Sequence, residues 1–118
     1  MNSALPMRTQ IKSEKEFEML SIETKTENEK AVVVLDGRLD TTSAPDLSNE
    51  MNSLPDTVTD LTFDCEKLQY ISSAGIRVVL AAIIEMKGKG SKVKMLHPNQ
   101  EVIKILEMTR LTEEVTIE

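Results

Sequence analysis

The most restrictive feature of the sequence is the way the spacing of its apolar residues changes along the chain. Residues 20–24 alternate apolar and polar side chains, which predicts a strand with one buried face. Residues 31–35 form a continuous β-branched run, which predicts a strand buried on both faces. Only a short polar turn separates the two, so we expect an antiparallel hairpin whose second strand ends at Asp36-Gly37.

After this hairpin, helical and strand spacings alternate. Helices are predicted from Ser43 to Pro55, from Ile76 to Gly88 and from Asn99 to Met108, and strands at residues 58–65, 92–96 and 114–117. Residues 64–69 are polar and predict a loop. In the second helix, Leu80 and Ile84 share the inward spacing of Ile76, Val79 and Ile83, so the helix is expected to be largely buried, with an exposed apolar strip near its start.

This order of elements predicts an α/β fold. We expect one domain at residues 19–118, with a mixed sheet of four or five strands and helices packed mainly on one face. Residues 1–18 are polar and are expected to form a flexible N-terminal extension.

Composition narrows the class of function. The net charge of −6 disfavours binding to nucleic acid, and it also disfavours binding to anionic membranes. No apolar run approaches the length of about 20 residues that spans a bilayer, and residues 1–18 lack the apolar stretch of a signal peptide. The single cysteine, Cys65, fits a reducing compartment and a place in the core, so a cytoplasmic location is expected. With His97 as its one histidine, the chain is predicted to need no metal or other cofactor.

The turn Ser72-Ser73-Ala74-Gly75 joins a predicted strand to a predicted apolar helix. Backbone N–H groups in the first turn of a helix lack intrahelical partners and favour negative charge. A phosphoryl group on either serine would therefore be stabilised there. A serine at this place also has a purely structural use as a helix cap, and spacing alone favours that use.

Residues 70–80, Tyr-Ile-Ser-Ser-Ala-Gly-Ile-Arg-Val-Val-Leu, resemble the signature of the STAS domain. Residues 36–40, Asp-Gly-Arg-Leu-Asp, are similar to the family's Gly-x-Leu-Asp motif, and Ser43-Ala44 to the helix start that follows it. The resemblance covers residues 19–118 and is greatest to the stand-alone anti-sigma-factor antagonists of bacterial partner-switching systems. The fold that this family implies is the one that the spacing predicts.

The resemblance also implies a mechanism and its residues. The unmodified protein would bind an anti-sigma factor with serine-kinase activity, phosphorylation of Ser73 would release it, and a serine phosphatase would regenerate it. In the family an aspartate commonly stands where this chain has Ser72. The resemblance implies that the partner contacts a set of residues in and beside the turn: Asp40, Thr41, Ser72, Ser73, Ala74, Gly75, Ile76 and Arg77.

The sequence alone is also compatible with other functions. The same domain would also suit an adaptor or scaffold subunit that is never phosphorylated, or a nucleotide or small-ligand site at the same turn. A hydrolase built on Ser73 and His97 lacks the Gly-x-Ser-x-Gly elbow, so we expect no enzyme activity. Asp36, Asp40 and Asp64 do not form the dense ligand loop of a cation site.

Overall fold

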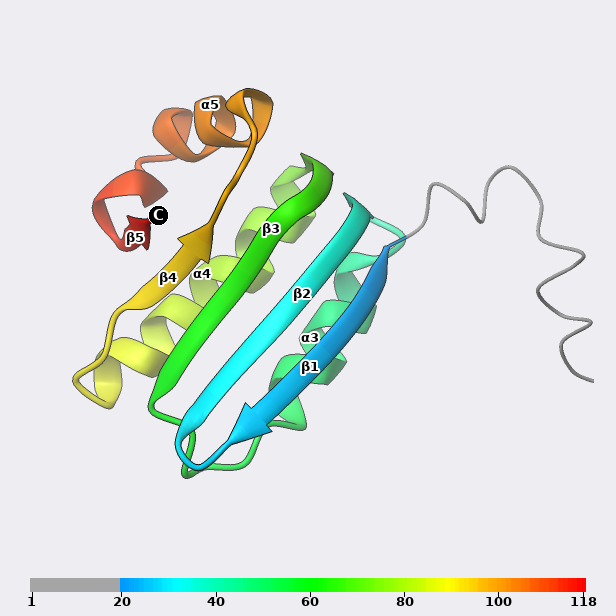
Figure 1. Ribbon diagram of the computed structural model, residues 1–118. Coiled ribbons are helices and arrows are strands. Elements are labelled where there is room, and N and C mark those ends of the chain that lie inside the picture. Colours follow the sequence, from blue (N-terminus) through cyan, green and yellow to red (C-terminus); the bar gives the residue numbers. More distant parts are fainter. Residues whose placement is uncertain (1–19) are drawn as a thin grey trace, which may run out of the picture.

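Five strands, paired in the order β1-β2-β3-β4-β5, form a mixed sheet in the computed structural model, which describes residues 20–118. The predicted hairpin is confirmed, since β1 runs antiparallel to β2, and the remaining neighbours are parallel (Figure 1). The predicted extension, residues 1–18, lies outside the described residues. The strands are β1 (Ser21–Glu27), β2 (Lys30–Leu39), β3 (Asp60–Ile71), β4 (Val93–Leu96) and β5 (Val115–Ile117).

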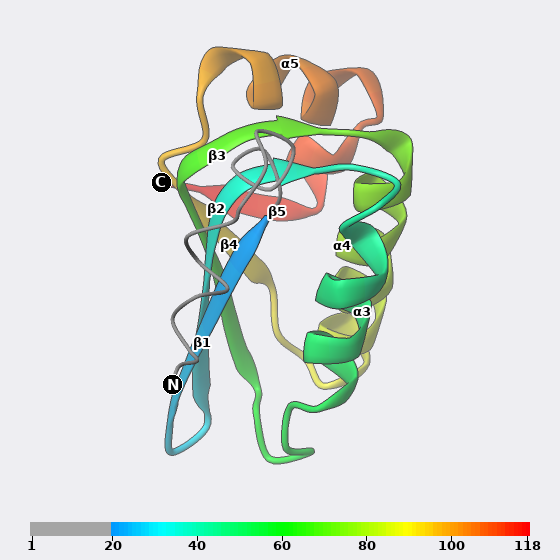
Figure 2. The same ribbon diagram turned by 90° about the vertical axis from the view of Figure 1, so that its right-hand side faces the viewer.

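The helices lie mainly on one face of this sheet, as predicted. Figure 2 shows α3 (Ala44–Asn52) and α4 (Ser73–Gly88) side by side against that face, and α5 (Gln100–Met108) at one end of the sheet. A short 3-10 helix (Leu111–Glu113) leads into β5. Among residues 20–118, no helix has both the length and the apolar character needed to span a membrane.

The core lies between the sheet and helices α3 and α4. Val33, Leu35, Phe63 and Cys65 are fully buried there, but Val32 is only half-buried on the opposite face. The prediction that β2 is buried on both faces is therefore wrong, because α3 and α4 both cover the same face. The full burial of Cys65 confirms its predicted place in the core, and this burial raises the pKa of the thiol to about 12, which keeps it protonated.

Strand β3 is longer than its sequence suggests, and so is β2. Val34 pairs with Asp64, whereas Arg38 pairs with Tyr70, so four steps along β2 match six steps along β3. The two extra residues form β-bulges. They also change the spacing of the buried side chains of β3, from two at Leu61, Phe63 and Cys65 to three at Leu68 and Ile71.

This change of spacing explains two wrong predictions. Residues 64–69 belong to β3 and do not form a polar loop, because bulges interrupt the alternation by which a strand is normally detected. Asp36-Gly37 does not end β2, which continues to Leu39 in partnership with the bulged strand.

Helix α4 also departs from the predicted pattern. It begins at Ser73, three residues before the apolar spacing starts, and it buries Val79, Ile83 and Met86. Leu80 and Ile84, predicted to point inward, are 39% and 62% exposed. The helix packs against α3, β3 and β4 from one side only, so its apolar surface is wider than its buried surface.

Asn99 fixes the start of α5 with both ends of its side-chain amide. Its Oδ1 accepts a hydrogen bond from the backbone N–H of Val102 at 2.8 Å, and its Nδ2 donates to the carbonyl of Leu68 at 3.2 Å. Asn99→Ala should therefore lower the free energy of unfolding by about 1–2 kcal/mol. Gln100→Ala, at an exposed neighbouring position, should change it by less than about 0.5 kcal/mol in the same urea titration. Equal effects of the two changes would contradict the assigned role of Asn99.

Candidate functional site at the start of helix α4

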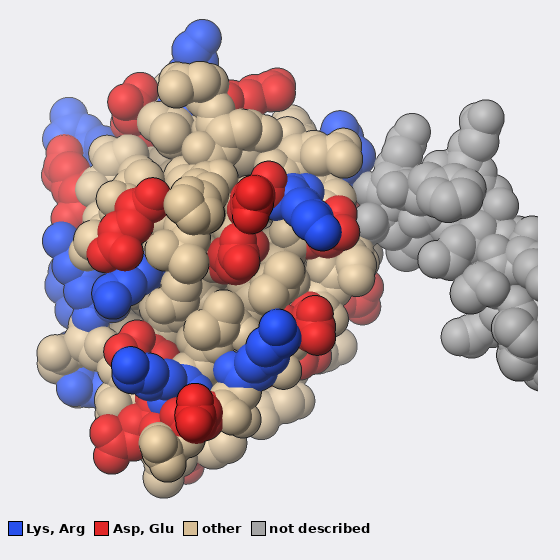
Figure 3. Space-filling view, in the orientation of Figure 1, with Lys and Arg blue, Asp and Glu red and all other residues tan. Residues whose placement is uncertain are grey.

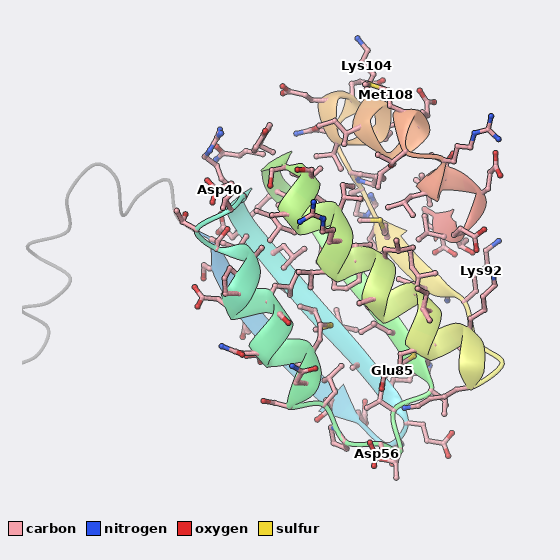
Figure 4. The ribbon with its side chains drawn as sticks, turned by 180° about the vertical axis from the view of Figure 1, so that it is seen from behind. Asp40, Asp56, Glu85, Lys92, Lys104 and Met108 are labelled. Atoms are coloured by element: carbon pink, nitrogen blue, oxygen red, sulfur yellow. The ribbon has the colours of Figure 1, made fainter. Side chains whose placement is uncertain are left out.

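The ends of β2 and β3 bring the two motifs of the sequence together. Leu39 pairs with Ile71, and the backbone N–H of Ser72 donates to the carbonyl of Leu39 at 2.9 Å. The turns that follow these strands, at Asp40 and at Ser72, therefore leave the sheet at the same end. Figure 4 shows Asp40 where β2 ends, at the end of the molecule at which α4 begins.

The two serines of the turn have different roles. Ser72 is the N-cap of α4: its backbone is extended, its carbonyl accepts the helical N–H of Ile76 at 2.9 Å, and its Oγ accepts from the N–H of Gly75 at 3.4 Å. Ser73 is the first helical residue, and its side chain is exposed and takes no part in the cap. The structural use as a cap thus belongs to Ser72, which leaves Ser73 accessible.

Gly75 makes the close approach of α4 to the sheet possible. A Cβ at this position would lie 2.6 Å from Cγ of Leu39 and 3.0 Å from Cγ1 of Ile71, far inside normal contact distance. Gly75 is buried, and the next residue, Ile76, is only 8% exposed. Both residues therefore face the core, so they hold the turn in place and offer little surface for a partner to contact.

The other predicted site residues form the accessible part of the region. Thr41 and Arg77 are exposed, and Ala74 is half-buried. Arg77 lies one turn after Ser73 along α4. Of the predicted site residues, Thr41, Ser73 and Arg77 are therefore the ones that a partner could most readily touch.

Asp40 is held in place by the loop that leads into α3. Its Oδ1 accepts hydrogen bonds from the Thr42 hydroxyl at 2.7 Å, the Thr42 N–H at 3.0 Å and the Ser43 N–H at 3.3 Å. The hydrogen bond from the Thr42 hydroxyl is the largest cause that lowers the pKa of Asp40 from its ordinary value of 3.8. The side chain thus carries a negative charge at this end of the sheet and also orders the loop.

Arg38 and Tyr70 lie beside the site, and the sequence analysis did not identify them as site residues. They are partners in the β2–β3 register, and the Arg38 guanidinium lies 4.4 Å from the centroid of the Tyr70 ring. Nε of Arg38 is also 3.9 Å from Oδ2 of Asp40. Nothing in the spacing indicated this pair, because the second bulge of β3 sets the register that brings the two together.

The charged side chains on one face of the molecule do not form a patch that is purely positive or purely negative. On the face shown in Figure 3, Lys and Arg side chains lie among Asp and Glu side chains rather than in a separate patch. Within residues 20–118, no three His, Cys, Asp or Glu side chains group closely enough to hold a metal ion. The exposed hydroxyl of Ser73 lies at the positive end of α4.

Comparison with known proteins agrees with the fold. The family model of the STAS domain matches residues 21–118. No curated protein shows significant sequence similarity to the chain.

Several solved structures share the fold. An anti-sigma factor antagonist from Mycobacterium paratuberculosis is similar at 17% identity, with a TM-score of 0.74 over 83% of this chain and 84% of that one. Unphosphorylated SpoIIAA, an anti-sigma factor antagonist, is similar at 19% identity, with a TM-score of 0.67 over 84% and 86%. The phosphorylated form of Bacillus SpoIIAA gives 19% identity and a TM-score of 0.68 over 83% and 91%.

Gly75→Ala tests the close approach of α4 to the sheet. The added Cβ must displace Leu39 or the helix, which should lower the free energy of unfolding by about 1–3 kcal/mol. Gly88→Ala is the matched control, because a Cβ at the last residue of the same helix meets nothing within 4 Å. Chemical denaturation of both variants measures the difference, and a harmless Gly75→Ala would refute the packing role.

Asp40→Ala tests how the stabilising effect of the Asp40 carboxylate depends on pH. The variant should be about 1 kcal/mol less stable than the wild type at neutral pH, since the hydrogen bonds that the carboxylate accepts from Thr42 and Ser43 are lost. The pKa of Asp40 is lowered by folding, so its stabilising effect is complete above about pH 4 and disappears as the pH falls through the folded pKa. Denaturant titrations of the wild type and the variant between pH 7 and pH 3 should show the difference in stability shrinking, and a difference that stays constant would contradict this role of the carboxylate.

Proposed function

This chain belongs to the STAS domain family, and we propose that it is an anti-sigma-factor antagonist controlled by phosphorylation of Ser73. The observation that carries the proposal is the division of roles between the two serines. Ser72 caps α4, while Ser73 presents an exposed hydroxyl at the first position of a 16-residue helix. SpoIIAA, which shares the fold, is known in an unphosphorylated and a phosphorylated form.

The start of α4 is a favourable place for a phosphate in the free protein. The first N–H groups of a helix have no intrahelical acceptors, and the helix dipole adds a partial positive charge there. A phosphoryl group on Ser73 would bring a charge of about −1.5 to −2 to this position. Ser72, in the place of the family's usual aspartate, adds no competing negative charge. The modified turn should therefore keep its fold.

The same phosphate would oppose binding of a partner. We propose that the unmodified turn packs against an anti-sigma factor with serine-kinase activity, which is thereby kept from its sigma factor. A hydrated dianion in that interface, near the ionised Asp40, would lose much of its hydration, and the single positive charge of Arg77, one turn along α4, would not balance it. A penalty of about 3 kcal/mol would weaken binding by more than 100-fold. A serine phosphatase would restore the binding form.

In this proposal the chain acts by binding in the cytoplasm and catalyses no reaction. The exposed residues Thr41, Ser73 and Arg77 would contact the partner directly. Asp40, Ser72, Ala74, Gly75 and Ile76 would hold the turn in the conformation that the partner recognises. An adaptor that is never phosphorylated would use the same surface and would differ only in the chemistry at Ser73.

Phosphorylation by an anti-sigma factor kinase, sought first among the neighbouring genes, tests the proposal. The full-length chain is incubated with kinase and ATP, and the modified residue is mapped by mass spectrometry. Ser73→Ala should abolish labelling without loss of stability, whereas Ser72→Ala should still be labelled but should lose about 1 kcal/mol through its cap. Labelling of Ser73→Ala at the wild-type level would show that the phosphoacceptor is wrongly assigned. Binding without any labelling would favour the adaptor.

A further inference from the structure

We infer that the partner-binding surface continues from Ser73 along α4 to Leu80 and Ile84, and that the anti-sigma factor kinase covers all of it. This inference rests on the proposed function. It adds a second, aliphatic part to the contact that the turn at Ser73 makes with the kinase. Neither residue was expected at the surface, since the apolar spacing predicted both to point inward.

Helical geometry places these residues on one line. At about 100° per residue, Leu80 is rotated by about −20° from Ser73 around the helix axis, and Ile84 by about +20°. At about 1.5 Å per residue, they lie about 10 Å and 16 Å from Ser73 along the axis. Arg77 lies close to the same line, one turn from Ser73. Together, Ser73, Arg77, Leu80 and Ile84 form the outer stripe of α4.

Exposure sets this stripe apart from the rest of the molecule. Within residues 20–118, four large hydrophobic side chains are exposed, and two of them, Leu80 at 39% and Ile84 at 62%, belong to the outer stripe. The other two, Met108 and Ile117, lie on different elements. Hydrophobic residues that gather on one exposed stripe beside a polar functional turn are typical of a protein–protein contact.

The size of an ordinary interface indicates which partner covers the stripe. A specific complex buries about 800 Å² on each side, which is a circular patch with a radius of about 16 Å. A footprint of this size that is centred on Ser73 includes Leu80 and extends to Ile84. The contact would match an aliphatic surface on the kinase, with an acidic side chain opposite Arg77. A second copy of this chain is a poorer occupant, because two aliphatic side chains fall far short of the area of a stable dimer.

The experiment measures binding of the kinase to full-length variants. Leu80→Gln, Ile84→Gln and the double variant remove aliphatic contact while keeping good helix formers at exposed positions. The Kd of the unphosphorylated double variant should rise about 10-fold, and the KM for phosphorylation of Ser73 should rise with an unchanged kcat. Met108→Gln is the matched control, since this side chain is 78% exposed on a different helix, α5 (Figure 4), and the Kd of this variant should change less than about twofold.

The possible outcomes distinguish a failure of this inference from a failure of the proposed function. If the wild type is labelled on Ser73 and the folded double variant binds like the wild type, the inference is overturned and the proposed function stands. If sedimentation shows that the double variant loses a dimer while its Kd is unchanged, the occupant is a second copy and the inference is also wrong. Tighter kinase binding by the double variant would mean that residues 1–19 cover the stripe, with the same consequence. If the wild type neither binds nor is labelled, both statements fall together.

Discussion

The contact of the first turn of α4 with the ends of β2 and β3 is the constraint on which the functional region depends. Gly75 lets the helix approach Leu39 and Ile71 more closely than any side chain would allow. The hydrogen bond from Ser72 to the Leu39 carbonyl fixes the same junction from the backbone. Because both strands end here, one close contact positions the loop with Asp40 and the turn with Ser73.

Much of the fold follows from the sequence, because most of its strands and helices have regular apolar spacing. The hairpin, the alternation of strands and helices and the mixed sheet are all predicted correctly. The wrong predictions concern two places, the bulges of β3 and the exposed side of α4. The bulges of β3 replace a spacing of two by a spacing of three after Cys65, which no rule for regular strands detects. Exposure of Leu80 and Ile84 depends on which sides of α4 have neighbours, and spacing alone does not contain that information.

The candidate site was predictable in position but not in detail. Spacing indicated a helix start with small residues, and the family resemblance selected Ser73. The structure adds the reason why the two serines differ, since only one of them lies at the capping position. Arg38 and Tyr70 could not be found in advance, because their contact depends on a register that is set by the second bulge.

The bulges of β3 have a consequence for how sequences with this fold can vary. Side chains of a strand alternate between its faces, so a shift of one residue reverses every orientation that follows. The exposed residues Glu66 and Gln69 can therefore be exchanged for other polar residues, whereas the loss of either would turn Ile71 out of the core and rotate the start of α4. In this part of the chain, the number of residues is more strictly determined than their identity. The number of residues in β3 thus determines where α4 begins and where the hydroxyl of Ser73 reaches the surface.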